Sequence, residues 1–145
     1  MFPDPSIKWR PYPSMIDGIE RPPAVFDQGL WRGVLHLIVV ASPPGLRAYG
    51  IEIACQIYAG FEEVAYAVSA HGADTVVYDG GVYIKEAGQS ALLNAYEAID
   101  PVGRRPRHFS FVGSEYCYEA LGFSEPVIRA FSTPDEAYAW GPARQ

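Results

Sequence analysis

The chain has 145 residues, of which 49% are hydrophobic and 19% charged, and its formal net charge is −6. This length and apolar content predict one compact domain, large enough to bury about 70% of its unfolded surface without a disulfide framework or a structural metal. The acidic balance disfavours nucleic acid as a partner, because the chain and a phosphate backbone repel each other. It would instead steer the chain towards a basic partner, although a modest negative charge is also ordinary for soluble proteins.

Neither a membrane anchor nor an oxidising compartment is indicated by the sequence. The N-terminal stretch lacks the continuous apolar core of a signal peptide, and no window approaches the roughly 18 apolar residues of a membrane span. The chain has two cysteines, Cys55 and Cys117, too few and too widely spaced for a disulfide scaffold or a zinc site. We therefore expect a reduced, cytoplasmic protein that binds no membrane.

Proline is concentrated at the start of the chain, in residues 1–23. Each proline removes a backbone donor and fixes φ, so regular structure is not expected in this segment. We interpret it as a proline-rich arm that precedes a single domain over residues 24–145. Its apolar side chains are expected to pin the arm along the domain or along a partner: Trp9, Tyr12, Met15 and Ile16.

The first half of the domain favours strands. Residues 31–42 contain a nearly unbroken apolar run, typical of a strand buried on both faces, and residues 42–45 form a Ser-Pro-Pro-Gly turn. Residues 46–60 alternate apolar and polar side chains, which predicts a strand paired with the preceding run, although a helical stripe also fits them. Residues 61–71 predict a helix, with acidic residues at its start and a histidine at its end.

The middle of the chain predicts a hairpin and a helix. In the hairpin, residues 75–78 and 82–85 flank an Asp-Gly-Gly turn, and Asp-Gly is a strong signal for a tight turn. Ser90 is expected to cap a helix that runs to Ile99 and stops at an Asp-Pro pair.

The C-terminal quarter alternates strand, helix, strand and helix, over residues 108–112, 114–121, 126–131 and 134–140. The last helix has the clearest signal, because Thr133 can cap it and Glu136 can reach back to the cap amide. Together the elements predict an α+β domain, with a mixed or mostly antiparallel sheet of about five or six strands and helices packed mainly on one face.

No motif for bond-making chemistry is recognisable. The sequence contains neither a phosphate-binding loop nor a dinucleotide-binding glycine pattern. Its three histidines, His36, His71 and His108, are isolated, whereas a helical metal-binding pair needs two histidines three or four residues apart. We expect no catalytic residues, no metal and no cofactor.

One alternative is a small enzyme or ligand-binding domain with a pocket near Cys117, His108 and Glu119. Cys117 would lie in the first turn of the predicted helix, where the helix dipole activates a thiol, with His108 as base. Against it, a cysteine between two tyrosines on an amphipathic helix commonly packs as a small apolar residue.

Carboxylates and tyrosines close together suggest a surface for a partner. Glu115 and Glu119 are four residues apart and would share one helical face as an acidic patch. The residues predicted to contact a partner are Glu115, Tyr116, Tyr118, Glu119, Asp135 and Glu136. The basic cluster at residues 104–107 is interpreted as a solvated connection rather than an anion site.

These observations predict a non-catalytic binding protein for a basic protein partner. In composition the chain is similar to small acidic inhibitors of toxins, such as bacterial immunity proteins, which suggests an inhibitor that masks a toxin. On this hypothesis the charged groups would speed encounter and the aromatic anchors would set the residence time.

Overall fold

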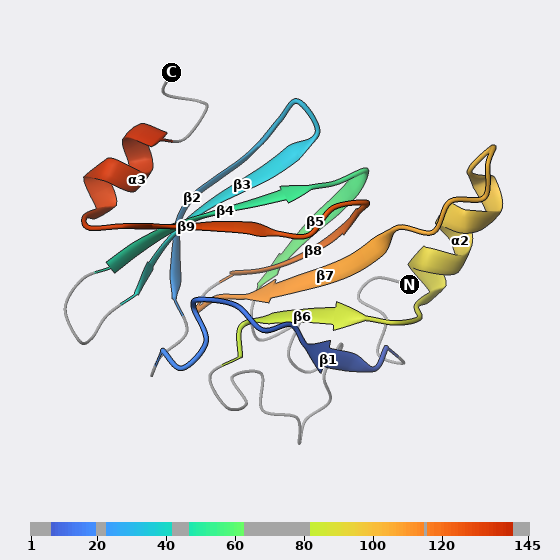
Figure 1. Cartoon of the computed structure of the whole chain (residues 1–145), viewed down its shortest axis with the longest axis horizontal. Helices are drawn as coiled ribbons and strands as arrows, with labels where there is room; N and C mark the ends of the chain where they lie inside the picture. The colour runs from blue at the N-terminus through green and yellow to red at the C-terminus, as the bar shows by residue number, and fades with distance from the viewer. Residues whose placement is uncertain (1–6, 20–22, 42–46, 63–81, 115, 141–145) are drawn as a thin grey trace.

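The computed structural model describes residues 7–19, 23–41, 47–62, 82–114 and 116–140, which form two antiparallel sheets and two helices (Figure 1). The five-stranded sheet has the order β1-β6-β7-β8-β5, and the four-stranded sheet has the order β2-β3-β4-β9. The elements are β1 (Trp9–Pro11), β2 (Ala24–Trp31), β3 (Val34–Ala41), β4 (Arg47–Ala54), β5 (Ile57–Glu62), β6 (Ile84–Ala87), α2 (Ala91–Ile99), β7 (Arg107–Val112), β8 (Tyr116–Gly122), β9 (Val127–Phe131) and α3 (Pro134–Trp140).

The predicted central hairpin is confirmed in the four-stranded sheet. The apolar run becomes β3, which pairs along its whole length with β4, so the helical alternative is wrong. Only residues 47–54 of the predicted strand pair with β3, because residues 57–60 belong to β5 of the other sheet. Edge strands β2 and β9 complete the sheet, and β2 carries a bulge between Val25 and Asp27. The predicted strand over residues 126–131 is β9.

The main core lies between the two sheets. Alternate side chains of β3 and β4, such as Leu37 and Ile51, meet alternate side chains of β7, Phe109 and Phe111, and all four are fully buried. Ile16 of the N-terminal arm is buried in the same cluster. Because burying a side chain of this size contributes about 1.5–3 kcal/mol, this layer is the main source of stability.

The chain crosses from one sheet to the other at Cys55 and Gln56. The Cys55 amide donates to the Gly33 carbonyl at the end of the β2–β3 hairpin, and the Gln56 amide donates to the Leu121 carbonyl of β8. Gly122 is required beside this crossing, because a Cβ there would collide with the backbone of Ala54. The strands therefore divide into two sheets instead of forming the single sheet that we expected.

Both described helices begin where the sequence predicts. Ser90 caps α2, with its Oγ accepting from the Leu93 amide at 3.0 Å. Thr133 Oγ1 accepts from the Glu136 amide at 3.2 Å, while the Glu136 carboxylate accepts from the amide of Ser132, one residue before the predicted partner. No helix within the described ranges is long and apolar enough to cross a membrane.

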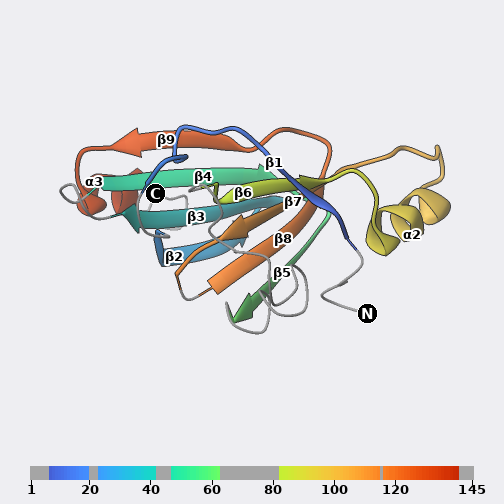
Figure 2. The ribbon, with the colours of Figure 1, turned by 90° about the horizontal axis from the view of Figure 1, so that it is seen from below.

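The two helices lie at opposite ends of the molecule (Figure 2). Helix α3 packs on β3, β4 and β9, on the face of the four-stranded sheet that points away from the core. Helix α2 follows β6 and extends beyond the end of the five-stranded sheet. An α+β fold with mostly antiparallel sheets is therefore confirmed.

The predicted helix over residues 114–121 is wrong, because this segment forms β8. Every residue of β8 except Tyr116 is buried, so apolar side chains occur on both faces of the strand. Such a run shows no alternation and can also be read at a helical period. Residues 61–62 likewise belong to β5 instead of starting a helix.

Part of the proline-rich arm forms a strand, against expectation. β1 pairs with β6, and Pro11 is its last residue. A proline is tolerated there because β1 is an edge strand, where a missing donor leaves no neighbour unsatisfied. Four other predictions lie outside the described residues: the turn at 42–45, the helix over 63–71, the strand at 75–78 and the Asp-Gly-Gly turn at 79–81.

Candidate functional site

His108 and Glu119 form a buried hydrogen-bonded pair at the centre of the five-stranded sheet. The distance from His108 Nε2 to Glu119 Oε1 is 2.7 Å, and the two side chains are 0% and 1% exposed. In the register of β7 and β8, Glu119 lies directly opposite Ser110, two residues from His108 on the same face. Pairing across the sheet therefore brings together two residues that are 11 positions apart in sequence.

Ser90 extends this pair into a three-residue chain. His108 Nδ1 lies 3.0 Å from Ser90 Oγ, the same oxygen that caps α2. In the tautomer with the proton on Nε2, the Ser90 hydroxyl donates to Nδ1 and Nε2 donates to Glu119 Oε1. These hydrogen bonds connect the first turn of α2 to the middle of β7 and β8.

Further polar groups surround the pair on the same sheet face. Ser110 Oγ and Glu119 Oε2 are buried and have no hydrogen-bond partner among the described residues. Lys85 is buried opposite Ser110, and the Trp9 ring meets His108 edge-on at a centroid distance of 5.0 Å. A buried polar atom without a partner costs about 1–3 kcal/mol, so this face holds more polar groups than packing alone favours.

The three residues around which a pocket was predicted lie on one face of the five-stranded sheet. His108 and Glu119 are in contact, and Cys117 lies on the same face, two residues before Glu119. Cys117 is in a strand, however, so the helix dipole that was expected to activate its thiol is absent. All three side chains are buried, so a reactant reaches them only if the residues that cover them move.

The residues predicted to bind a partner do not form one surface. Tyr116 is exposed, but Tyr118 and Glu119 are buried and point to opposite faces of β8. Burial raises the pKa of Tyr118 to about 12. Glu115 lies outside the described residues.

Two predicted residues, Asp135 and Glu136, are exposed in the first turn of α3, beside the other sheet. There they adjoin an aromatic surface that sequence reasoning missed. We define the aromatic face as six side chains on α3 and on the outer side of the four-stranded sheet: Phe26, Trp31, His36, Phe131, Tyr138 and Trp140.

Ring contacts join the members of the aromatic face. Phe26 of β2 meets Tyr138 at a centroid distance of 6.1 Å. His36 meets Trp140 at 5.7 Å and Trp31 at 6.5 Å. Phe26, Trp31 and Tyr138 are nevertheless exposed, because β2 is an edge strand and α3 covers only part of the sheet. No local pattern marks these residues, since aromatic side chains occur equally in core strands.

Two glycines shape the floor of the aromatic face. A Cβ at Gly50 would overlap the Trp140 ring, so Gly50 allows the indole to lie directly on β4. At Gly29 of β2 a Cβ would meet no atom within 4 Å, so this part of the strand is open. On the aromatic face, the Trp140 ring therefore fills the space above Gly50, whereas the space above Gly29, beside Trp31, is open.

His36 lies on β3, opposite Gly29 of β2 on one side and opposite Glu52 of β4 on the other. Burial lowers the pKa of His36, and the Glu52 carboxylate opposes this effect. Both ring nitrogens are buried and, in the described part of the chain, have no hydrogen-bond partner. We therefore assign His36 a neutral, packing role beneath Trp31 and Trp140.

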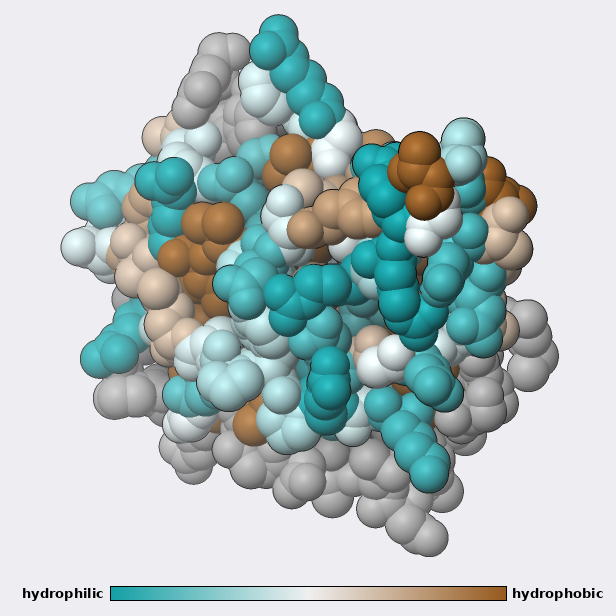
Figure 3. Space-filling view, turned by 45° about the vertical axis from the view of Figure 1, so that its right-hand side comes forward, coloured by the Kyte–Doolittle hydropathy of each residue, from teal (hydrophilic) through white to brown (hydrophobic). Residues whose placement is uncertain are grey.

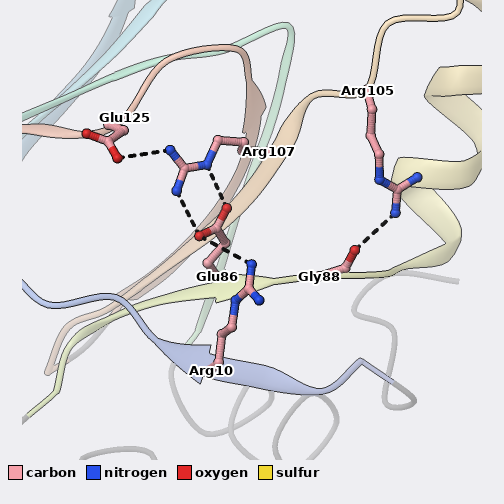
Figure 4. Close-up of polar contacts among 6 residues, drawn as sticks. All are labelled: Arg10, Glu86, Gly88, Arg105, Arg107 and Glu125. Atoms are coloured by element: carbon pink, nitrogen blue, oxygen red, sulfur yellow. Dashed lines mark hydrogen bonds and ion pairs between the residues drawn. The ribbon is translucent and has the colours of Figure 1, made fainter.

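The basic cluster at residues 104–107 is neutralised by carboxylates. Arg107 holds Glu86 with two hydrogen bonds, of 2.7 and 2.9 Å, and reaches Glu125 at 3.1 Å (Figure 4). Arg104 pairs with Asp100, and Arg105 with Glu97. Because each arginine already has an anionic partner, the cluster is not organised as an anion site.

One side of the molecule is mainly hydrophilic. Figure 3 shows a hydrophilic band across its middle with separate apolar areas on either side. Within the described ranges, no group of three or more His, Cys, Asp or Glu side chains could hold a metal ion. No protein-family model, curated protein or solved structure matches the chain.

Proposed function

We propose that this chain is a non-catalytic acidic binding protein that engages a basic protein partner through its aromatic face. The observation that carries the proposal is the placement of exposed Phe26, Trp31 and Tyr138 beside the exposed carboxylates of Asp135 and Glu136. Large aromatic side chains are enriched in protein interfaces. Carboxylates beside them favour a basic partner through charge complementarity.

The net charge of −6 supports the same proposal. A chain of this charge attracts a basic protein over long range, while aromatic anchors hold it once it has docked. An inhibitor that masks a toxin, of the type suggested by the composition, is the specific form of this function.

The test compares captured proteins across matched variants. Wild-type protein, a Phe26→Ser/Tyr138→Ser variant and an Ile99→Ser variant are used as baits in extract of the native host at low salt. Ile99 is an equally apolar, exposed control on α2, away from the aromatic face. We expect a basic protein that wild type and Ile99→Ser retain, that the double variant loses, and that elutes as salt is raised. Equal capture by all three baits, or an acidic captured protein, contradicts the proposal.

A second candidate function is a small enzyme or ligand-binding domain centred on His108 and Glu119. The 2.7 Å contact between them favours it, as do Ser110 Oγ and Glu119 Oε2, which have no hydrogen-bond partner among the described residues. Its requirement is access, because a reacting molecule must reach side chains that are now covered. Reactivity of the Cys117 thiol in the folded protein tests this candidate directly.

A further inference from the structure

We propose that the partner contributes an extended basic segment, which adds as a fifth strand to the edge of β2. This inference rests on the proposed function and specifies how the partner docks. In the described part of the chain, β2 is an edge of the four-stranded sheet, with β3 on its only paired side. Its backbone groups on the other side are therefore available to a strand of another chain.

The bulge between Val25 and Asp27 interrupts the start of β2, but residues 28–31 beyond it carry no charge and no proline. The eight residues of β2, AVFDQGLW, include no lysine, arginine or proline. Phe26, Leu30 and Trp31 are 59%, 51% and 47% exposed. A long, apolar, exposed edge strand of this kind marks a site for strand addition.

The other edges are less suited to strand addition. β1 has three residues and ends in Pro11, and β9 has five residues with Arg129 in an ion pair to Glu52. β5 has six residues, and its exposed apolar side chains, Ile57 and Tyr58, are 38% and 36% exposed. Among the residues that the structure describes, β2 is therefore both the longest edge and the one with the most exposed apolar side chains.

Recognition of side chains on the added strand would occur over Gly29. Alternate side chains of an added strand point to the outer face, where Gly29 leaves open space beside Trp31. Apolar side chains can pack there against the indole. Asp27 lies on the same face, since it pairs with Ile38 beneath α3. Its Oδ1 accepts from the Gln28 amide at 2.9 Å, and its carboxylate adds negative charge to this side of β2.

The charge of the chain selects a basic segment over a second copy. Two copies would each carry a net charge of −6 and would repel as they approached, whereas a basic segment is attracted. The proposal therefore commits to an extended segment of the basic partner, in which lysine or arginine alternates with apolar residues.

The experiment uses a displayed library of random peptides about twelve residues long, enough to span β2 at about 3.3 Å per residue. Peptides selected on the wild-type chain are synthesised and measured against Leu30→Lys and Val127→Lys by fluorescence anisotropy. Leu30 and Val127 are 51% and 49% exposed, on the two opposite edges of one sheet, so both variants add the same charge at equal exposure. Thermal unfolding of both variants confirms that they are folded.

We expect the selected peptides to be rich in lysine and arginine. Leu30→Lys should weaken their binding at least tenfold, while Val127→Lys changes it by less than about twofold. Hydrogen exchange should show protection over residues 24–31, and none over 127–131, when a peptide is bound.

Each contrary result has a distinct meaning. Basic peptides that bind Leu30→Lys and Val127→Lys equally well would overturn strand addition at β2 but leave the proposed function standing. Failure to select any peptide would also overturn strand addition alone, whereas selected peptides without basic residues would overturn both. A concentration-dependent dimer of the wild type that Leu30→Lys abolishes would show that a second copy occupies the edge instead.

Discussion

His108 and Glu119 are joined by a 2.7 Å hydrogen bond at a place where neither side chain is more than 1% exposed. A buried pair of this kind is most damaging when one member is removed, because the other is left without a partner away from water. Ser90 links His108 to α2, so loss of the His108–Glu119 hydrogen bond would affect both the β7–β8 strand pair and the helix.

The first prediction concerns the stability that this pair provides. Glu119→Ala should lower the free energy of unfolding by about 3 kcal/mol, since it leaves His108 Nε2 without an acceptor. Glu125→Ala is the control, because Glu125 is exposed and its surface ion pair with Arg107 is worth about 1 kcal/mol or less. Urea unfolding measures both, and equal losses would show that the buried pair contributes no more than a surface contact.

The second prediction concerns the two thiols. Burial raises the pKa of Cys55, and Cys117 is fully buried, so both should react with a disulfide reagent at pH 8 only as fast as the protein opens. We expect folded protein to react at least about a hundredfold more slowly than protein in urea. Rapid modification of Cys117 alone, with the fold retained, would instead support the pocket near His108.

The third prediction concerns acid stability. Hydrogen bonds from Arg107 lower the pKa of Glu86 in the folded protein. Because that pKa lies below the unfolded value of about 4.3, Glu86 contributes stability above the unfolded value and loses it as pH falls through the folded one. Glu86→Gln should therefore reduce stability at pH 6 and flatten its decline towards pH 2.

Urea midpoints across this range measure the effect. The pKa of Asp100 is also lowered, by a hydrogen bond from the Val102 amide and by the contact with Arg104. Glu86→Gln leaves these contacts in place, so the part of the pH dependence that comes from Asp100 is the same in both proteins. An unchanged slope in Glu86→Gln would show that the arginine contacts do not favour the ionised form of Glu86.

The fourth prediction concerns the aromatic face. Gly50→Ala should displace the Trp140 ring from β4 and destabilise the protein by about 1–3 kcal/mol, with a red shift in tryptophan emission. Gly29→Ala is the matched control on the same sheet, because its Cβ meets no atom within 4 Å. Similar effects of the two substitutions would contradict the packing of Trp140 against Gly50.

Much of the secondary structure could be predicted from local patterns. The strands at β3, β7 and β9 follow from apolar runs and β4 from alternating side chains, and α2 and α3 follow from the caps supplied by Ser90 and Thr133. The helix predicted at β8 failed because a strand buried on both faces has no period of its own. The predicted helix also placed Glu119 in an exposed acidic patch, whereas in β8 its side chain is buried.

The sequence by itself determined the composition of the domain, its acidity, the helix caps and the position of most strands, because each depends on neighbouring residues. Only the tertiary structure decided that β4 and β5 belong to different sheets, that His108 meets Glu119, and that Phe26 lies beside Tyr138. Those relationships depend on strand register and on close approach at Gly122 and Gly50. They join residues far apart in sequence, and no periodicity within one segment encodes which distant strand will be its neighbour.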